Sequence, residues 1–511
     1  MSQHSVAARL DDSNHLFRTF RHGAQGAYSR AFGDSQVRIA SPLARSVIAV
    51  CVTEFLTVAV HALDKAGARF GDVRREDRTA FVVRAANEQI QAVNRIRRQG
   101  WGVRAFVDGA WGYASGTSQD ADDVATAARR AVAIAKADAR AGVPKIALRA
   151  MPSLRKTIRQ KVKVEPSDVS GEEKIAAVMD LCRAQRIESI SSTNASYSES
   201  DWSFELANTS GARVSWREVR LRIAGQTIAA EGDRREAAYE FRDGTVGWEL
   251  VKGMDLAEFG GGVAQEACEM LKAEKPPAGL RTVVTDPGVS GLLAHEVMGH
   301  ASEADEIVKE RSFLTHQVGK KVGSPLVTMY DDGTVPGAHG SIPFDAEGTP
   351  SHKTKVIDQG IYRGFLHSLE TSGALKARPT GNGRAQDFGR RVWVRMTNTF
   401  FAAGRQRKDE LLEETKDGVL TKSWISGMED PVGGGFQAVT QSGFLIRKGE
   451  VGPRVRGMTL TGNALSILKS VDMVSRELKL DGGTCGKGEE DYVPVSAGGP
   501  FMRCKIVVGG G

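Results

Sequence analysis

The stretch GVRAFVDGAWGYASGT, residues 102–117, alternates apolar residues with polar residues and glycines. Residues 81–93, FVVRAANEQIQAV, have a similar pattern. A repeat of two directs alternate side chains to opposite faces of a β-strand, and glycine is frequent in turns. The two stretches therefore predict antiparallel strands joined by turns, and a sheet begins here.

Helices and further strands are expected around this sheet. Residues 120–142 and 256–275 have the apolar spacing of helices, and Ser170 with Glu173 forms a capping box ahead of another helix. Strand patterning returns over residues 188–250. These patterns predict an α+β lobe in which helices pack on an antiparallel sheet.

The chain is too long for a single domain. Its 511 residues exceed the roughly 250 to 300 residues at which one hydrophobic core stops growing. The sequence Pro-Pro-Ala-Gly at residues 276–279 interrupts regular structure and is the best boundary. We expect a poorly ordered extension at residues 1–45, an N-terminal α+β lobe at 46–275 and a C-terminal β-rich lobe at 280–511.

Composition favours a soluble globular protein, with 41% hydrophobic and 26% charged residues. The 69 basic and 62 acidic residues are interspersed, and the densest basic runs lack the aromatic residues that would stack on bases, which argues against nucleic acid. Five scattered cysteines indicate reduced thiols and a cytoplasmic location. The long apolar run at residues 46–63 contains Glu54 and His61, so we expect a buried amphipathic helix and no membrane span.

One segment of the C-terminal lobe departs from its surroundings. Most of this lobe is rich in glycine, turns and short apolar runs, a pattern typical of antiparallel β structure. Residues 287–306, PGVSGLLAHEVMGHASEADE, have Pro287 at the start and apolar residues on one side. They predict a helix inside the β-rich lobe.

Two histidines in this helix bracket a glutamate. His295 and His300 carry the nitrogen donors that zinc favours, and a catalytic zinc site takes three protein ligands. Residues five apart on an ideal helix are separated by about 140°, so a regular helix cannot direct both at one ion. Gly299, just before His300, lets the helix end or bulge there. The alternative is a set of ordinary polar residues on a surface helix.

A third ligand is expected from elsewhere in the β-rich lobe. Cys485 lies in a turn with glycines on both sides, which allow the backbone to approach a buried metal closely. Glu303, one turn beyond His300, is the rival third ligand. A lone cysteine can also be a small buried hydrophobe, and that interpretation fits the other four cysteines.

Glu296, next to a candidate ligand, is better placed to accept a proton than to bind metal. A water acidified by a metal can attack a carbonyl once a general base removes its proton. Peptide hydrolysis is a natural use of this chemistry.

At these residues the sequence resembles the TldD/PmbA family of metallopeptidases, closest to the TldD branch, which carries H-E-x-x-x-H. The similarity continues in order over approximately residues 45–510. The stretches that carry it are VRAFVDGAWGYAS (103–115), AHEVMGHASEAD (294–305), DDGTVPGAHGSIPFDAEGTP (331–350), PTGNGR (379–384), RMTNTF (395–400) and GTCGK (483–487).

The resemblance implies a two-lobed subunit with Zn²⁺ held by His295, His300 and Cys485, and with Glu296 as the general base. It also implies a homodimer, or a heterodimer with an inactive PmbA-like relative, and retention of the histidine motif argues for the catalytic partner. The implied substrates are unfolded peptides, antitoxins and the leaders of modified peptides. The first 45 residues have no counterpart in the family.

The expected function is therefore a zinc metallopeptidase acting on unfolded or extended peptides. One alternative is a non-catalytic peptide-binding or regulatory subunit with a structural zinc, and another is a modulator associated with nucleic acid. Asn382 and Arg384, in a glycine-containing loop, are the candidate substrate-binding residues. For that loop the alternative is a tight turn with a solvated arginine.

Overall fold

A computed structural model describes residues 42–142, 145–149 and 153–509, with side chains from residue 54 onward. The chain divides into two compact units, Met1–Cys51 and Val52–Gly511. The second unit contains every sheet of the described chain. The expectation of a poorly ordered extension concerns residues that lie almost wholly outside the described ranges.

The first described element is α1 (Pro42–Lys65). From Glu54 onward its apolar side chains, including Phe55, Ala59 and Leu63, are buried in a cluster with residues of the first strands. Among the helices of the described residues, none combines the length and the apolar character needed to cross a membrane.

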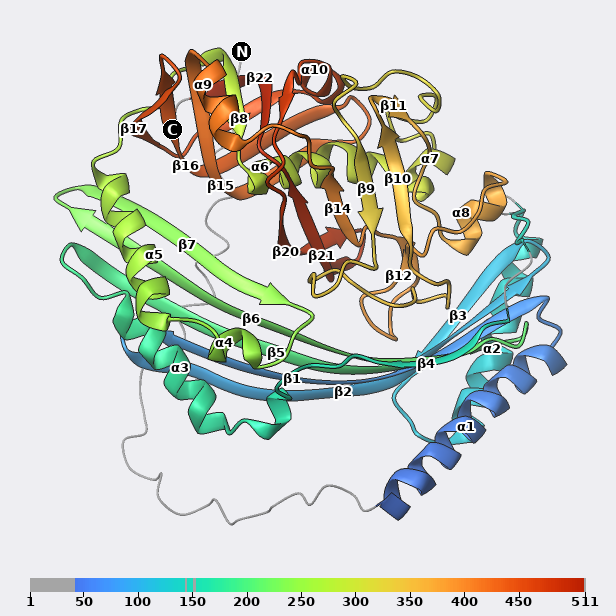
Figure 1. Cartoon of the computed structure of the whole chain (residues 1–511). Coiled ribbons are helices and arrows are strands. Elements are labelled where there is room, and N and C mark those ends of the chain that lie inside the picture. The colour runs from blue at the N-terminus through green and yellow to red at the C-terminus, as the bar shows by residue number, and fades with distance from the viewer. Residues whose placement is uncertain (1–41, 143–144, 150–152, 510–511) are drawn as a thin grey trace, which may run out of the picture. The chain divides into compact units, whose positions relative to one another are not determined.

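A seven-stranded sheet forms the N-terminal part of this unit (Figure 1). Its order is β3-β2-β1-β5-β6-β4, with β7 also paired to β6, and only the β4–β6 pair is parallel. The strands are β1 (Phe70–Ala86), β2 (Gln89–Val107), β3 (Ala110–Gly116), β4 (Arg155–Arg159), β5 (Ile190–Asn208), β6 (Arg213–Glu231) and β7 (Arg234–Gly244).

Helices pack on this sheet through small and aliphatic residues. The side chain of Asp120 caps α2 (Ala121–Arg140), and that of Ser170 accepts from the Glu173 N–H at the start of α3 (Gly171–Ala184). The helices α4 (Glu249–Lys252) and α5 (Leu256–Leu271) follow the last strand. The cap at Ser170 and the helix from residue 120 onward are as predicted, because both depend only on neighbouring residues.

The C-terminal part contains two larger sheets and one two-stranded ribbon. One sheet has the order β15-β8-β22-β18-β16-β17, with β19 paired to β22, and the other has the order β11-β10-β9-β14-β21-β20. The strands are β8 (Gly279–Thr285), β9 (Met329–Asp332), β10 (Lys353–Asp358), β11 (Ile361–Tyr362), β12 (Gly383–Arg384), β13 (Trp393–Val394), β14 (Asn398–Phe401), β15 (Asp417–Asp430), β16 (Gly435–Arg447), β17 (Glu450–Arg456), β18 (Thr459–Asn463), β19 (Met473–Val474), β20 (Lys479–Lys487), β21 (Glu490–Gly499) and β22 (Met502–Gly509).

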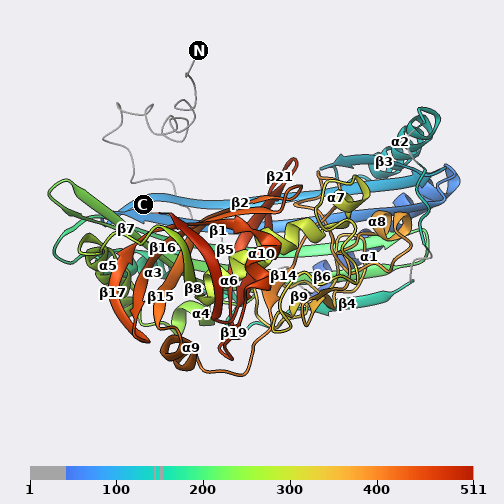
Figure 2. The same ribbon diagram turned by 90° about the horizontal axis from the view of Figure 1, so that it is seen from above.

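The helical segment that starts at Pro287 lies among these strands, and α6 (Pro287–Leu292) is its first part (Figure 2). Its apolar residues share one buried cluster with side chains of both larger sheets, for example Leu293 with Val495 and Ile506. Four short helices complete this part: α7 (Ala304–Val308), α8 (Leu369–Ala374), α9 (Lys408–Glu414) and α10 (Ala464–Lys469).

The predicted α+β class is confirmed, because antiparallel sheets and packed helices occur in one chain. Polar contacts join the N-terminal sheet to the C-terminal part. Arg104 bonds Glu347 at 2.8 Å, and Arg74 donates to the carbonyl of Arg390 at 2.8 Å. The sheet therefore has one face on helices and the other on the part that carries the candidate site.

Candidate metal centre

The histidine motif lies on a π-helical segment, Leu293–Gly299, which continues directly from α6. The N–H of His300 donates to the carbonyl of His295, five residues earlier. This i→i+5 bonding winds the backbone more loosely than an α-helix does, so residues five apart fall on nearly the same face. The π-helical winding therefore brings His295 and His300 to one side, which a regular α-helix could not do.

Gly299 has a different role from the one expected of it. Its φ of −65° and ψ of −60° are ordinary helical angles, so the backbone there does not require glycine. A Cβ atom at this position would instead overlap Sδ of Met396, which is fully buried. Glycine is needed because the motif packs closely against the segment that connects β13 to β14.

We predict that Gly299→Ala destabilises the protein and lowers its metal content. Overpacking of a core typically costs about 1–3 kcal/mol, and the displaced backbone is the one that carries both histidines. Thermal melting and zinc analysis of the purified protein measure the two effects. Gly262→Ala in α5 is the matched control, because a Cβ atom there meets nothing within 4 Å. Wild-type melting and zinc content in Gly299→Ala would contradict the packing argument.

His295, His300 and Cys485 converge. One potential ligand atom from each lies within 4.8 Å of the other two. Cys485 Sγ is 3.3 Å from His300 Nε2, and the two imidazole rings are 5.0 Å apart. Cys485 is carried by β20 and is buried, as is His295. Two histidines and a cysteine that lies at least 185 residues after them thus form one cluster of two nitrogens and one sulfur.

The chemistry of this cluster fits a zinc ion. Nδ1 of His295 is buried and has no hydrogen-bond partner among the described residues. Such an orphaned polar atom costs about 1–3 kcal/mol unless something else satisfies it. Imidazole and thiolate are the donors that zinc prefers.

Electrostatics favour the ligand form of the cysteine. Burial by itself raises the pKa of Cys485, but the imidazoles of His300 and His295 outweigh burial and hold this pKa well below its ordinary value. The thiolate is the form that binds metals. Burial also opposes protonation of His300, whereas Cys485 and Glu303 raise the pKa of that histidine well above its usual range.

Glu303 faces the other nitrogen of His300. Its Oε2 lies 3.1 Å from His300 Nδ1 and accepts from Lys487 Nζ at 2.8 Å. Although burial opposes ionisation, Lys487 and His300 lower the pKa of Glu303 to about 2. Because Cys485 is at Nε2 and Glu303 at Nδ1, the geometry gives Glu303 the place of a carboxylate that orients a ligating histidine. The rival third ligand therefore lies outside the His295, His300 and Cys485 cluster.

Glu296 lies beside a second carboxyl group that the sequence did not suggest. Glu429, near the end of β15, forms a group with Glu296 and His300 whose potential ligand atoms lie within 4.8 Å of one another. Burial is the main cause that raises the pKa of Glu429 to about 7; Glu296 adds to this effect and His300 opposes it. A Cβ atom at Gly427 would lie 2.9 Å from Glu296 Cγ, so that glycine allows β15 to approach.

Arg395 fixes the hairpin that carries Cys485. Its fully buried guanidinium donates to the Cys485 carbonyl at 2.6 Å and to Glu490 at 2.8 Å. Arg395 and Lys487 lie in the family-like stretches RMTNTF and GTCGK, so a sequence signal for them exists, although it does not predict their roles. Glu429 has no such signal, because it lies in an ordinary alternating strand.

Asn382 and Arg384 are not part of this cluster. The Asn382 side chain donates to Asp331 at 2.8 Å and to the Arg395 carbonyl at 3.0 Å. Arg384 is buried in β12 and donates to the Met396 carbonyl at 2.5 Å. Burial is the main cause that lowers the pKa of Arg384 to about 10. The alternative of a solvated arginine is therefore wrong, and a substrate contact by these residues stays a prediction.

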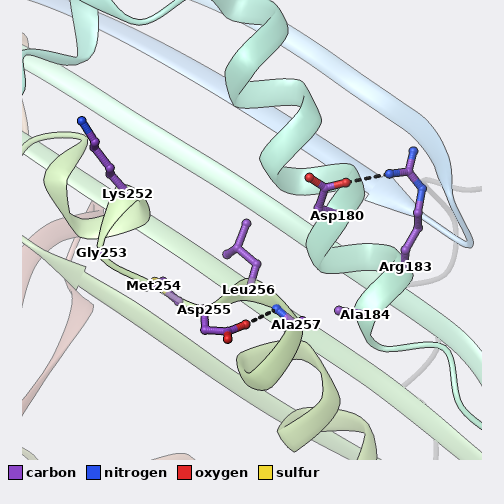
Figure 3. Close-up of a pocket in the computed structure, with 9 residues that line it drawn as sticks. All are labelled: Asp180, Arg183, Ala184, Lys252, Gly253, Met254, Asp255, Leu256 and Ala257. Atoms are coloured by element: carbon purple, nitrogen blue, oxygen red, sulfur yellow. Dashed lines mark hydrogen bonds and ion pairs between the residues drawn. The ribbon is translucent and has the colours of Figure 1, made fainter.

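A surface hollow of about 920 Å³ lies between α3 and the turn that joins α4 to α5 (Figure 3). Asp180 pairs with Arg183 and Asp255 caps α5, whereas Lys252 forms no ion pair with a described residue. None of the candidate site residues lines it. It offers no chemistry of its own.

The fold and the donor set together define a candidate metalloprotein, and comparisons with known proteins agree. Three segments match parts of the PmbA/TldA metallopeptidases: domain 1 at residues 71–135, the central domain at 164–274 and the C-terminal domain at 278–510. The chain belongs to this PmbA/TldD family of metallopeptidases.

Several relatives are named metalloproteases. A protein of Methanothermobacter thermautotrophicus named metalloprotease is 32% identical over 443 residues, which cover 86% of this chain and 95% of the relative. A metalloprotease TldD homolog of Haemophilus influenzae is 35% identical over 57% of this chain and 62% of its own length. A zinc metalloprotease TldD homolog of Saccharolobus solfataricus is 30% identical over 56% of this chain and 63% of its own length.

Solved structures share the fold at lower identity. A crystal structure from Thermotoga maritima has a TM-score of 0.73 at 19% identity and covers 90% of this chain and all of that one. The crystal structure of TldE from Thermococcus kodakarensis has a TM-score of 0.68 at 16% identity, with coverage of 90% and 99%. At these identities the likeness concerns the fold alone.

Proposed function

We propose that this protein is a zinc peptidase that hydrolyses peptide bonds of unfolded or extended peptides. The observation that carries the proposal is the convergence of His295, His300 and Cys485 within 4.8 Å, next to Glu296. The metalloprotease names of several relatives support it.

In this proposal the three converging side chains hold the ion, and Glu296 handles the proton. Bound zinc supplies a Lewis acid that acidifies water and polarises a carbonyl. Glu296, half-buried between the π-helical segment and β15, accepts the proton of the attacking water. It then returns a proton to the leaving amine. Glu303 and Lys487 keep the ring of His300 oriented through Nδ1.

The proposed substrate class follows from the position of β20. This strand is last in its sheet and pairs only with β21 among the described strands. A strand with a free edge can accept an extended peptide through main-chain hydrogen bonds, and an unfolded chain has its main-chain groups available for this pairing. Cys485 lies on this strand, so a peptide added there would pass the proposed ion.

A non-catalytic subunit with a structural zinc is the competing function. Structural zinc sites are closed by four protein ligands, whereas catalytic sites use three and keep one position for water. Three donors converge here, and the carboxyl pair Glu296 and Glu429 lies beside them. This arrangement favours the catalytic proposal.

We further propose that the protein works in the cytoplasm as a homodimer or as a heterodimer with an inactive relative. The four cysteines whose side chains the structure describes are free, which suits a reducing compartment. Sedimentation of an active, partner-free 55 kDa species would contradict the dimer.

Metal removal tests the proposed function. The purified protein should contain about one zinc per chain and cleave an unstructured peptide, as followed by mass spectrometry. Treatment with a chelator should abolish cleavage, and added zinc should restore it. Cleavage that persists after complete zinc removal, or a zinc-loaded protein that cleaves no peptide in a broad panel, would overturn the proposal.

A further inference from the structure

A second pocket lies close to the candidate metal centre, on the other side of β20. It has a volume of about 270 Å³ and is bounded by β1, β5 and β6 of the N-terminal sheet and by the β20–β21 hairpin. Its charged lining consists of three arginines and one acid, Arg78, Arg220, Arg222 and Glu199, and the ring of His339 also lines it.

Most of these charges are already neutralised by neighbours. Arg220 bonds Glu218 through both terminal nitrogens, and Arg222 bonds Asp243 at 3.0 Å. Glu199 accepts from Lys174 at 2.8 Å and from Tyr197. Glu199 is thus paired with Lys174, which does not line the pocket.

Arg78 is the exception. Its guanidinium packs over the ring of Trp202, 5.5 Å from the ring centroid, and forms no hydrogen bond or ion pair with any described residue. Its Nε is buried and unpartnered. Burial and the charge of Arg220 lower the pKa of Arg78 from its usual value. The charges of Glu218 and Glu76 act on Arg78 in the opposite direction, but neither carboxylate forms an ion pair or hydrogen bond with it among the described residues.

The pKa of His339 is also affected by the positive charges of this pocket. Burial, followed by the charges of Arg220 and Arg222, lowers the pKa of His339 well below its ordinary value. Its Nδ1 is also buried without a hydrogen bond, and the Asp243 carboxylate is 3.6 Å away. A neutral imidazole with a free nitrogen can bond a ligand that enters beside Arg78.

The alternation of β20 relates this pocket to the metal centre. Successive side chains of a strand point to opposite faces. Cys485 faces the histidines, whereas Thr484 lines the pocket together with its cross-strand neighbour Pro494. A peptide extended along the free edge of β20 would direct alternate side chains toward the ion and toward the pocket.

We propose that this pocket binds an acidic side chain of the peptide substrate, with Arg78 as the counter-ion for its carboxylate. The inference rests on the proposed function and names a substrate class for it. Ligand pockets for drug-sized molecules have volumes of roughly 300–1,000 Å³, so a smaller one suits a single side chain. The protein would therefore prefer peptides with Asp or Glu at one position near the scissile bond.

Peptide binding to a Glu296→Gln background tests this inference without turnover. Fluorescently labelled unstructured peptides that differ only by Glu or Gln at one position are titrated and followed by anisotropy. At the preferred position the Glu peptide should bind roughly tenfold more tightly than the Gln peptide, as expected for a charge-assisted hydrogen bond. Added Arg78→Gln should remove this difference, and Arg78→Lys should restore part of it.

Arg84→Gln, on an exposed position of the same strand, is the matched control and should leave the preference intact. Unchanged melting and zinc content in Arg78→Gln would separate a lost contact from a lost fold. Equal binding of Glu and Gln peptides at every position, or a preference that survives Arg78→Gln, would overturn the inference. So would displacement by inorganic phosphate without any preference between the peptides. The proposed function fails separately, if zinc-loaded wild type cleaves no peptide.

Discussion

Glu296→Ala is expected to lower peptide turnover by roughly two to four decades while bound zinc stays near one per chain, because this change removes only a general base. His295, His300 and Cys485 keep their donor atoms in this variant. Turnover of a peptide and zinc content, measured on the same preparation, give the two values. Glu172→Ala, at an exposed position in the first turn of α3, is a control that should change neither.

The comparison with His295→Ala decides the role of Glu296. The histidine variant should lose zinc and activity together. If Glu296→Ala loses zinc as readily, Glu296 is a ligand and the assignment of roles is wrong. Glu296 also groups with His300 and Glu429 as a possible set of metal ligands, and the zinc measurement separates this alternative.

Cys485→Ala is expected to lower bound zinc and activity together. The site loses a charged sulfur donor, and water in its place binds zinc more weakly. Cys504→Ala is a close control, since Cys504 is also buried and free but lies in β22 among apolar residues, where burial raises its pKa to about 12. Cys504→Ala should lower the stability of the protein somewhat and leave its zinc content unchanged. Zinc content and turnover, measured for both variants, check this.

Glu303→Ala separates the two candidates for the third ligand. A carboxylate that only orients His300 should, when removed, weaken metal affinity by roughly 10- to 100-fold without abolishing it. If Cys485→Ala keeps full zinc and Glu303→Ala loses it, the ligand is Glu303.

The local start signals and the histidine motif could be read from the sequence because each depends on neighbouring residues. Ser170 caps a helix where expected, a helix follows Asp120 as expected, and the strands around residues 102–117 are antiparallel. The position of Cys485 beside His300 could be proposed only from its glycine-flanked turn and the family resemblance, because 185 residues separate the two.

Other features depend on tertiary packing and could not be predicted. The sequence predicted that the helix ends or bulges near Gly299, and the winding at Leu293–Gly299 is π-helical, but the close packing of Gly299 on Met396, almost 100 residues later, was not visible in it. Glu429 joins the site only because β15 passes beside Glu296. Arg384 is in a glycine-containing stretch whose sequence resembles a loop, yet its side chain is buried and its guanidinium donates to the Met396 carbonyl.

Strand β20 carries both Cys485, which lies at Nε2 of His300, and Lys487, which bonds the Glu303 carboxylate at Nδ1 of the same ring. Cys485 and Lys487 are two residues apart on β20, and they reach opposite edges of the same imidazole, the lysine through Glu303. Contributions of groups that share a partner are not additive. The free-energy effects of Cys485 and Lys487 substitutions on zinc affinity should therefore be coupled in a double-mutant cycle, even though only one of these residues is a proposed ligand.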